Sequence, residues 1–235
     1  MIPNNKILLF DSKIINNFSE LKSILGDNYE IGLITSDNYE NIIKKINNNI
    51  NFDHLFISCN SIYYHNNKLI YKRNIKNYKN YKELDILIKL FIRYLSYVPY
   101  LLSTNFVELR DGIIYLSLIG TNATEEEKNM FIELDKKNNY LVNFLFELKN
   151  KAYKLKIINL FEISINDETS LTIIPKEWSM DKILNTIKPS DYNIYYFSNN
   201  YNNKSNNYNL FNNDNIINYN VNNIEDIKNI IMNIT

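Results

Sequence analysis

An aspartate follows the first apolar run of this chain. Residues 6–10 read KILLF, which is the pattern of a strand buried on both faces of a parallel sheet, and Asp11 comes next. Open α/β sheets place reactive groups at the carboxyl ends of such strands, where a carboxylate can act as a nucleophile. An aspartate at a strand end can also cap the following turn, so the position alone leaves both interpretations open.

Histidine, cysteine and glycine offer little further chemistry. His54 and His65 are isolated from other ligand types in the sequence, and His65 falls in a predicted turn, so we predict no metal site. Cys59 is the single cysteine, which excludes a disulfide framework and fits a reducing compartment. Loops that cradle phosphate with backbone N–H groups need glycine, and the chain has only 4 glycines.

The composition is that of a globular protein, and its balanced charge does not favour binding to nucleic acid. Hydrophobic residues make up 45% of the 235 residues, and 26 Lys and Arg balance 26 Asp and Glu. This balance argues against nucleic-acid binding by bulk electrostatics. The N-terminal apolar run is too short for a signal peptide or a membrane span, so we expect a cytoplasmic protein that does not enter a membrane.

Strands alternate with helices in the first 75 residues. Strands are predicted at residues 6–10, 30–35, 55–58, 61–64 and 68–72, and helices at 18–25 and 39–46. We expect Gly26 to end the first helix and Ser36-Asp37 to cap the second. Residues 65–67 are predicted to form a hairpin turn. This alternation is typical of an α/β sheet.

The middle of the chain has a different pattern, and the end returns to the first one. Asp111-Gly112 predicts a hairpin, and Thr124 with Glu127 forms a capping box. In the middle, helices are predicted at residues 81–97, 124–135 and 139–153, and strands at 106–110, 113–118, 156–165 and 170–174. Towards the end, we predict a helix at 178–187, a strand at 193–197, a polar loop at 198–215 and a helix at 224–234. The pattern indicates an α/β core domain at 1–75 and 176–235, with an inserted α+β cap domain at 76–175.

A long stretch of the middle resembles a known family. Residues 106–137, FVELRDGIIYLSLIGTNATEEEKNMFIELDKK, are similar without gaps to the cap of eukaryotic phosphomannomutases, which belong to the haloacid dehalogenase superfamily. Shorter stretches match as well: LLFDSK resembles the family's L-F-D-x-D-G-T, and YYFSNN resembles its Y-F-F-G-D-K. The resemblance implies a haloacid dehalogenase-type α/β core with a parallel sheet and an inserted α+β cap.

Such enzymes interconvert mannose 6-phosphate and mannose 1-phosphate. The resemblance implies that Asp11 occupies the nucleophile position, that a second aspartate two residues later would act as acid and base, and that Mg²⁺ would neutralise the phosphoryl oxygens. Here the second position is Lys13, and Asn199 and Asn207 occupy the positions of metal-binding carboxylates. Neutral amides are weak ligands for Mg²⁺, so no metal and no cofactor is expected unless the protein is active.

The substrate-binding positions of the family are partly kept. Arg110 keeps a family arginine, Lys128 replaces another, and Ser36 and Ser170 keep hydroxyl groups. Lysine keeps the charge but not the bidentate fork of arginine. For Arg110 alone, the alternative is a hairpin arginine in a surface ion pair. Further positions have changed: a clamp arginine is Thr121, an acid near the sugar is Thr172, and the lysine that pairs with the nucleophile is Met180, with Lys182 two residues further on.

Because so many catalytic positions have changed together, we predict a phosphomannomutase-like protein that has lost catalysis. The family dimerises through the cap, which is the better-kept part here, so the prediction is a binding module that forms a homodimer or docks on a protein partner. One alternative is a residual phosphomannomutase or weak phosphatase that uses Asp11. Another is a sugar-phosphate sensor that binds through Arg110 and Lys128 without turnover.

Overall fold

The computed structural model describes residues 5–15, 17–25, 29–46, 51–99, 103–199 and 208–234. The chain divides into two compact units. The first holds the described residues up to Lys72 and from Met180 onward, and the second is Arg73–Ser179. These limits lie next to the predicted limits of the core and the cap.

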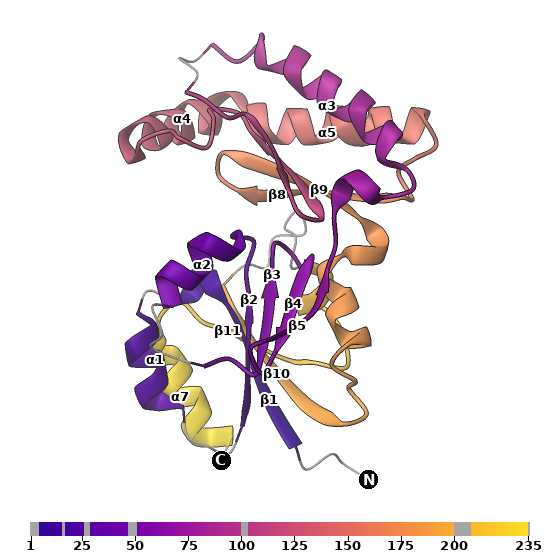
Figure 1. The fold of residues 1–235 in the computed structure, drawn as a ribbon. Coiled ribbons are helices and arrows are strands. Elements are labelled where there is room, and N and C mark those ends of the chain that lie inside the picture. Colours follow the sequence, from indigo (N-terminus) through magenta and orange to yellow (C-terminus); the bar gives the residue numbers. More distant parts are fainter. Residues whose placement is uncertain are drawn as a thin grey trace. The chain divides into compact units, whose positions relative to one another are not determined.

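A seven-stranded sheet forms the centre of the first unit (Figure 1). Its order is β11-β10-β1-β2-β3-β4-β5, parallel from β11 to β3, with β4 and β5 antiparallel. The strands are β1 (Asn5–Asp11), β2 (Glu30–Ile34), β3 (His54–Ile57), β4 (Ile62–His65), β5 (Lys68–Lys72), β10 (Tyr192–Ser198) and β11 (Ile217–Asn220). The carboxyl ends of β1, β2, β3 and β10 therefore meet at one edge of the sheet.

Three helices cover one face of this sheet: α1 (Phe18–Ile24), α2 (Tyr39–Ile46) and α7 (Ile224–Ile234). Alternate strand residues such as Leu8 and Leu33 pack against their apolar sides. The predicted cap of α2 was wrong, because Asn38 accepts the hydrogen bond from the backbone of Asn41 at 2.9 Å. The predicted stop at Gly26 lies outside the described residues.

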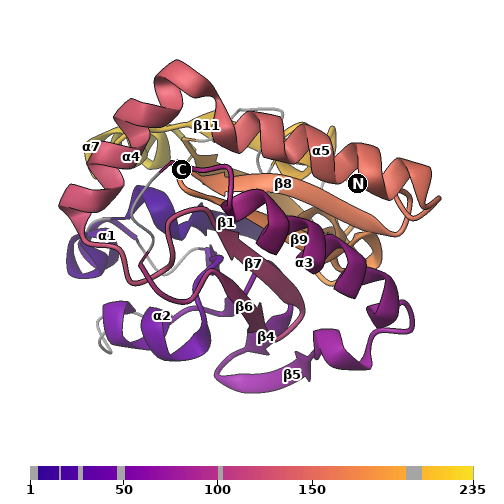
Figure 2. The ribbon, with the colours of Figure 1, turned by 90° about the horizontal axis from the view of Figure 1, so that it is seen from above.

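The second unit is a four-stranded antiparallel sheet with helices on one face (Figure 2). Its strand order is β6-β7-β9-β8. The elements are α3 (Tyr81–Leu95), β6 (Val107–Arg110), β7 (Ile113–Ser117), α4 (Glu125–Asn138), α5 (Tyr140–Lys154), β8 (Phe161–Asp167) and β9 (Ser170–Pro175), with the 3₁₀ turn η2 (Ile75–Asn77) before α3. Phe91 of α3 and Phe144 of α5 meet with ring centroids 5.2 Å apart above the sheet. Neither unit contains a described helix that is long and apolar enough to cross a membrane.

The hairpin turns differ in detail from their prediction. Asn66 and Asn67 both have positive φ, at 49° and 61°, as a two-residue type I′ turn requires. His65 therefore belongs to β4 and not to the turn. In the β6–β7 hairpin, Asp111 takes the left-handed conformation with φ 43°.

Three further predictions were wrong. The strand predicted from residue 156 begins at Phe161, because the chain continues after α5 in a turn that opens with Lys156 at φ 59°. The helix predicted at 178–187 is two 3₁₀ segments, η3 (Lys176–Trp178) and η4 (Met180–Asn185), separated by Ser179 in an extended conformation. The region predicted as a loop contains the short helix α6 (Tyr208–Phe211), and β11 follows it.

Candidate functional site

Asp11 is the last residue of β1, and its side chain is almost fully buried. One carboxylate oxygen accepts the backbone N–H of Lys13 at 3.0 Å and thereby caps the 3₁₀ turn η1 (Ser12–Ile14). The hydroxyl of Ser198, at the end of β10, donates to the other oxygen at 3.5 Å. Asp11 therefore caps a turn, as one interpretation of the sequence expects. It also lies at the carboxyl edge of a parallel sheet, where the other interpretation places a nucleophile, and that role stays a prediction.

Hydroxyl groups tie the neighbouring strand ends together. The hydroxyl of Ser12 donates to that of Thr35 at 2.9 Å, and the backbone of Asp37 donates to the same threonine oxygen at 3.0 Å. Ser36 lies between Thr35 and Asp37, half-buried. The edge thus places Ser36 and Asp11 on adjacent strand ends.

A strained loop borders this edge. Ser58, Cys59 and Asn60 are three consecutive buried residues with positive φ, at 49°, 51° and 67°. The backbone of Cys59 donates to the carbonyl of Thr35 at 3.0 Å, which holds the loop against the end of β2. Non-glycine residues in this region cost of order 1–3 kcal/mol each, and they persist only where the surrounding structure holds them.

The changed catalytic positions have other surroundings in this chain. Lys13 and Asn199 are exposed, while Asn207 lies outside the described residues. Met180 is buried, and Lys182 forms an ion pair with Asp181 at 2.7 Å. Residues 199–213 contain no aspartate or glutamate. Among the described residues, a backbone N–H and a hydroxyl donate hydrogen bonds to Asp11, and these groups do not fit the carboxylate-rich coordination that Mg²⁺ prefers.

In the second unit, Arg110 is held by its own hairpin. Its Nε donates to Glu108 at 2.6 Å, and its guanidinium lies 3.9 Å from the ring centroid of Tyr115. The hydroxyl of Thr121 donates to the other oxygen of Glu108 at 2.6 Å. The hairpin ion pair, considered as an alternative role for Arg110, is thus present, with a side chain only 19% exposed.

Tyr115 links Arg110 to the half-buried carboxylate of Asp167. Its hydroxyl donates to Asp167 Oδ2 at 2.9 Å, while the backbone and hydroxyl of Thr169 both donate to Oδ1 at 2.9 Å. Burial by itself would raise the pKa of Asp167, but hydrogen bonds from Ser170, Thr169 and Tyr115 outweigh it and lower the pKa. Arg110 and Ser170 thus belong to one connected network, which we call the cap network (Glu108, Arg110, Tyr115, Asp167 and Ser170).

The cap network lies on the face of the sheet that turns away from α3 and α5. Ile114 and Leu171 pack into the core beneath these helices, so their neighbours Tyr115 and Ser170 point to the opposite face. Lys128 lies elsewhere, on α4, where its Nζ is 2.5 Å from the carboxylate of Glu125.

The prediction that the two histidines are isolated was wrong. His54 and His65 are directly paired across β3 and β4, with ring centroids 4.7 Å apart, and Glu30 lies beside His54. Sequence reasoning missed Glu30 altogether. If β3 and β4 had been paired as a hairpin at the sequence level, their register would have predicted that His54 and His65 lie opposite each other.

Comparison with solved structures defines the fold. An N-terminally truncated Plasmodium falciparum IMP-nucleotidase aligns with a TM-score of 0.63 over 99% of this chain and 70% of that chain, at 13% identity. The sucrose-phosphatase of Synechocystis sp. PCC6803, solved with sucrose and phosphate, aligns with a TM-score of 0.52 over 96% and 86%, at 11% identity. These likenesses concern the fold alone, and they confirm the predicted haloacid dehalogenase-type α/β core.

The family follows from the sequence itself. The model of the family described as eukaryotic phosphomannomutase matches residues 18–235, and the chain belongs to this family. Phosphomannomutase 1 of Mus musculus is 25% identical over 79% of this chain and 71% of its own length. Phosphomannomutase 2 of Dictyostelium discoideum is 25% identical over 82% and 81%. The matched residues begin after Asp11 and Lys13, so the nucleophile position expected of Asp11 from the LLFDSK stretch stays a prediction.

Proposed function

We propose that this member of the phosphomannomutase family has lost phosphoryl transfer and serves as a binding or interaction module through its second unit. The observation that carries the proposal is the chemistry of the Asp11 edge. A single buried carboxylate is held there by the backbone of Lys13 and the hydroxyl of Ser198. The position that would supply a second carboxylate is the exposed Lys13.

The substitutions at this edge remove two large contributions to catalysis. A positioned general acid and base is typically worth about 10²–10⁴-fold in rate, and lysine is a poor replacement for the aspartate at this position. Preorganised charge at the transferred phosphoryl group is usually the largest contribution. Among the described residues, Asp11 accepts hydrogen bonds from a backbone N–H and a hydroxyl, and another carboxylate at this edge, Asp37, pairs with Lys45.

The second unit supports interaction better than sugar-phosphate sensing. Its arginine and lysine already have carboxylate partners: Arg110 Nε donates to Glu108 at 2.6 Å, and Lys128 pairs with Glu125. A phosphate would have to share these side chains with a carboxylate, which weakens its binding. In contrast, Phe146 and Tyr153 of α5 are 66% and 73% exposed, and they lie two helical turns apart on one side of the helix. Exposed aromatic side chains are typical anchors of protein interfaces.

A coupled mutase assay tests the loss of catalysis. The full chain is incubated with mannose 1-phosphate, Mg²⁺ and a hexose 1,6-bisphosphate activator, and phosphatase activity is followed in parallel by phosphate release. We expect no turnover above background for the wild type or for Asp11→Asn, which keeps an oxygen to cap η1. Asp37→Asn is the matched control, since Asp37 lies at the same edge but pairs with Lys45.

One result would overturn the proposal. Turnover that disappears in Asp11→Asn and persists in Asp37→Asn would establish a residual phosphomannomutase or phosphatase that uses Asp11. Circular dichroism of each variant shows whether a loss of turnover reflects a loss of fold.

A further inference from the structure

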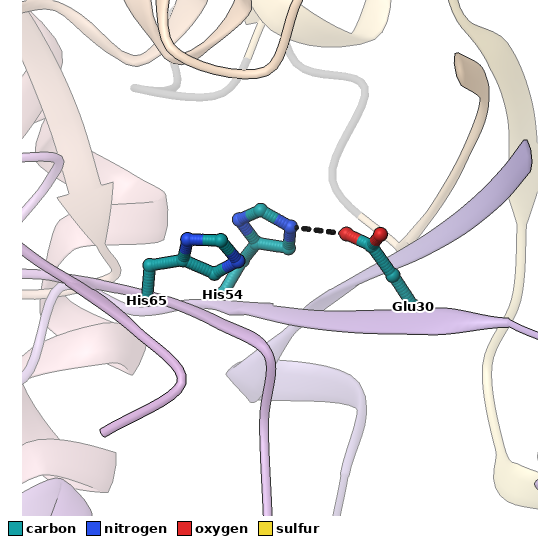
Figure 3. A group of neighbouring side chains, drawn as sticks. All are labelled: Glu30, His54 and His65. Atoms are coloured by element: carbon teal, nitrogen blue, oxygen red, sulfur yellow. Dashed lines mark hydrogen bonds and ion pairs between the residues drawn. The ribbon is translucent and has the colours of Figure 1, made fainter. Parts of the chain in front are cut away.

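Two histidines and a glutamate from three strands meet at one end of the first unit's sheet (Figure 3). The rings of His54 and His65 lie 9° from parallel, and His54 Nε2 is 2.8 Å from a carboxylate oxygen of Glu30. One ligand atom from each side chain lies within 4.8 Å of the other two. Within the described part of the chain, no other group of three His, Cys, Asp or Glu side chains has this spacing.

The sheet register places these side chains on one face. Gly32 pairs with His54, and Glu30 precedes Gly32 by two residues, so Glu30 and His54 point to the same side. His65 is the direct cross-strand partner of His54. The Leu9 side chain fills the place that a Cβ atom on Gly32 would take, so glycine allows Leu9 to pack beside His54.

The hydrogen bond between His54 Nδ1 and the Tyr63 hydroxyl suits a metal ligand at His54. His54 Nε2 lies 2.8 Å from the Glu30 carboxylate, and His54 Nδ1 lies 2.8 Å from the Tyr63 hydroxyl, which can both donate and accept a hydrogen bond. A cation at Nε2 would move the ring proton to Nδ1, where the Tyr63 oxygen can accept it.

Glu30 is partly exposed and has room to adjust, whereas His65 Nε2 lies 3.3 Å from the Asn66 amide nitrogen. The Glu30 side chain is 36% exposed, and its second oxygen accepts from the Tyr192 hydroxyl at 3.0 Å. Ligands of a tetrahedral site with bonds of about 2.0–2.1 Å stand roughly 3.3 Å apart, so closing the group requires small side-chain rotations. The exposed side of Glu30 leaves a fourth position open to water.

We propose that Glu30, His54 and His65 form a binding site for a borderline divalent cation of the Zn²⁺ class. Two imidazoles and one carboxylate favour Zn²⁺, Co²⁺ or Ni²⁺ over Mg²⁺, which prefers oxygen ligands alone. The site is separate from the Asp11 edge, because Glu30 begins β2, whereas Asp11 pairs with Ile34 at its other end. At about 3.3 Å per residue, the length of β2 places the two on the order of 13 Å apart.

Titration calorimetry on the full chain without an affinity tag tests this site. We expect Zn²⁺ to bind with one equivalent per chain in a buffer that contains excess Mg²⁺, and Co²⁺ to give the visible absorption of a tetrahedral site. Glu30→Gln and His65→Ala should each weaken Zn²⁺ binding by about tenfold or more. Cys59→Ser is the matched control, because Cys59 is the only thiol in the chain and should not contribute.

The outcomes separate a metal site from a hydrogen-bonded pair. Absence of saturable Zn²⁺ binding to the wild type would overturn the proposal and leave Glu30 and His54 as a structural pair. Binding by His65→Ala and Glu30→Gln that is as tight as binding by the wild type would also overturn it. Binding that depends on Cys59 would overturn it as well. If His65→Ala fails to fold, the more exposed Glu30→Gln carries the test. The result of Zn²⁺ titration is independent of the mutase assay, because that assay probes Asp11 at the opposite end of the strands.

Discussion

Asp167 is a half-buried carboxylate that accepts hydrogen bonds from the hydroxyl groups of Tyr115 and Thr169. Its pKa is lowered in the folded protein relative to the usual 3.8, because the hydrogen bonds to its charged form outweigh burial. A carboxyl whose folded-state pKa is lowered adds stability above its unfolded pKa and loses it as the pH falls through the folded pKa. The contribution of Asp167 is therefore complete at neutral pH and disappears in acid below 3.8.

Tyr115→Phe removes one of these donors and keeps the ring beneath Arg110. We expect the free energy of unfolding at pH 7 to fall by about 1.5–3 kcal/mol, because a half-buried charge loses a hydrogen bond. The difference from wild type should narrow as the pH falls below 3.8 and through the lowered folded-state pKa of Asp167, because the protonated carboxyl no longer gains from these donors. Urea unfolding of both proteins at several pH values measures this difference in the free energy of unfolding. The control is Tyr153→Phe at an exposed position, and an equal loss in both variants would contradict the assignment.

At the level of single residues, the sequence predicts chemistry well where it depends on neighbours along the chain. Asp11 follows an apolar strand, and Arg110 lies two residues from the Glu108 that binds it. The group of Glu30, His54 and His65 was not predictable in this way. Its members come from three strands, and only the pairing register of β2, β3 and β4 brings them together.

At the level of elements, α4 begins with a complete capping box. The hydroxyl of Thr124 accepts the backbone N–H of Glu127 at 3.2 Å, and the Glu127 carboxylate accepts that of Thr124 at 2.7 Å. Thr124→Ala leaves an N–H of the first turn without this partner, so we expect a loss of about 1 kcal/mol in the free energy of unfolding. Chemical denaturation measures it. Glu127→Gln keeps the box and serves as control, and a larger loss there would show that the charge, not the cap, stabilises α4.

The elements that sequence patterns predicted are those with strong local signals. The capping box of α4 and the apolar spacing of α3 and α7 were sufficient to predict these three helices. The segment that forms η3 and η4 has helical composition, but Ser179 adopts an extended conformation that interrupts it. Strand β11 is mostly polar and short, and it exists because β10 offers it a parallel partner. Such pairing is a tertiary effect that no local pattern contains.

At the level of the whole molecule, the second unit has an apolar outer surface as well as an inner core. Leu141, Phe144 and Leu148 of α5 pack inward, and the opposite side of the helix exposes Phe146 and Tyr153. Ile92 of α3 and Met130 of α4 are also more than half exposed. The first unit exposes large apolar side chains too, such as Ile70 and Met232, so the argument for an interface on the second unit rests on the two aromatic rings that α5 presents on one side. The family resemblance makes a second copy of this chain the partner that we propose.

Light scattering coupled to size exclusion tests this homodimer. For the full chain we expect a mass near twice the 28.0 kDa of one copy. Combining Phe146→Lys with Tyr153→Lys should return the mass to that of one chain, because each buried aromatic anchor is worth about 2 kcal/mol and the two lysines would be desolvated. Met232→Lys, at a 63% exposed position of α7 in the first unit, is the matched control and should remain dimeric. If the wild type has the mass of one chain at high concentration, the homodimer is excluded and docking on a different protein becomes the proposal. If Met232→Lys alone dissociates the dimer, the interface lies on the first unit.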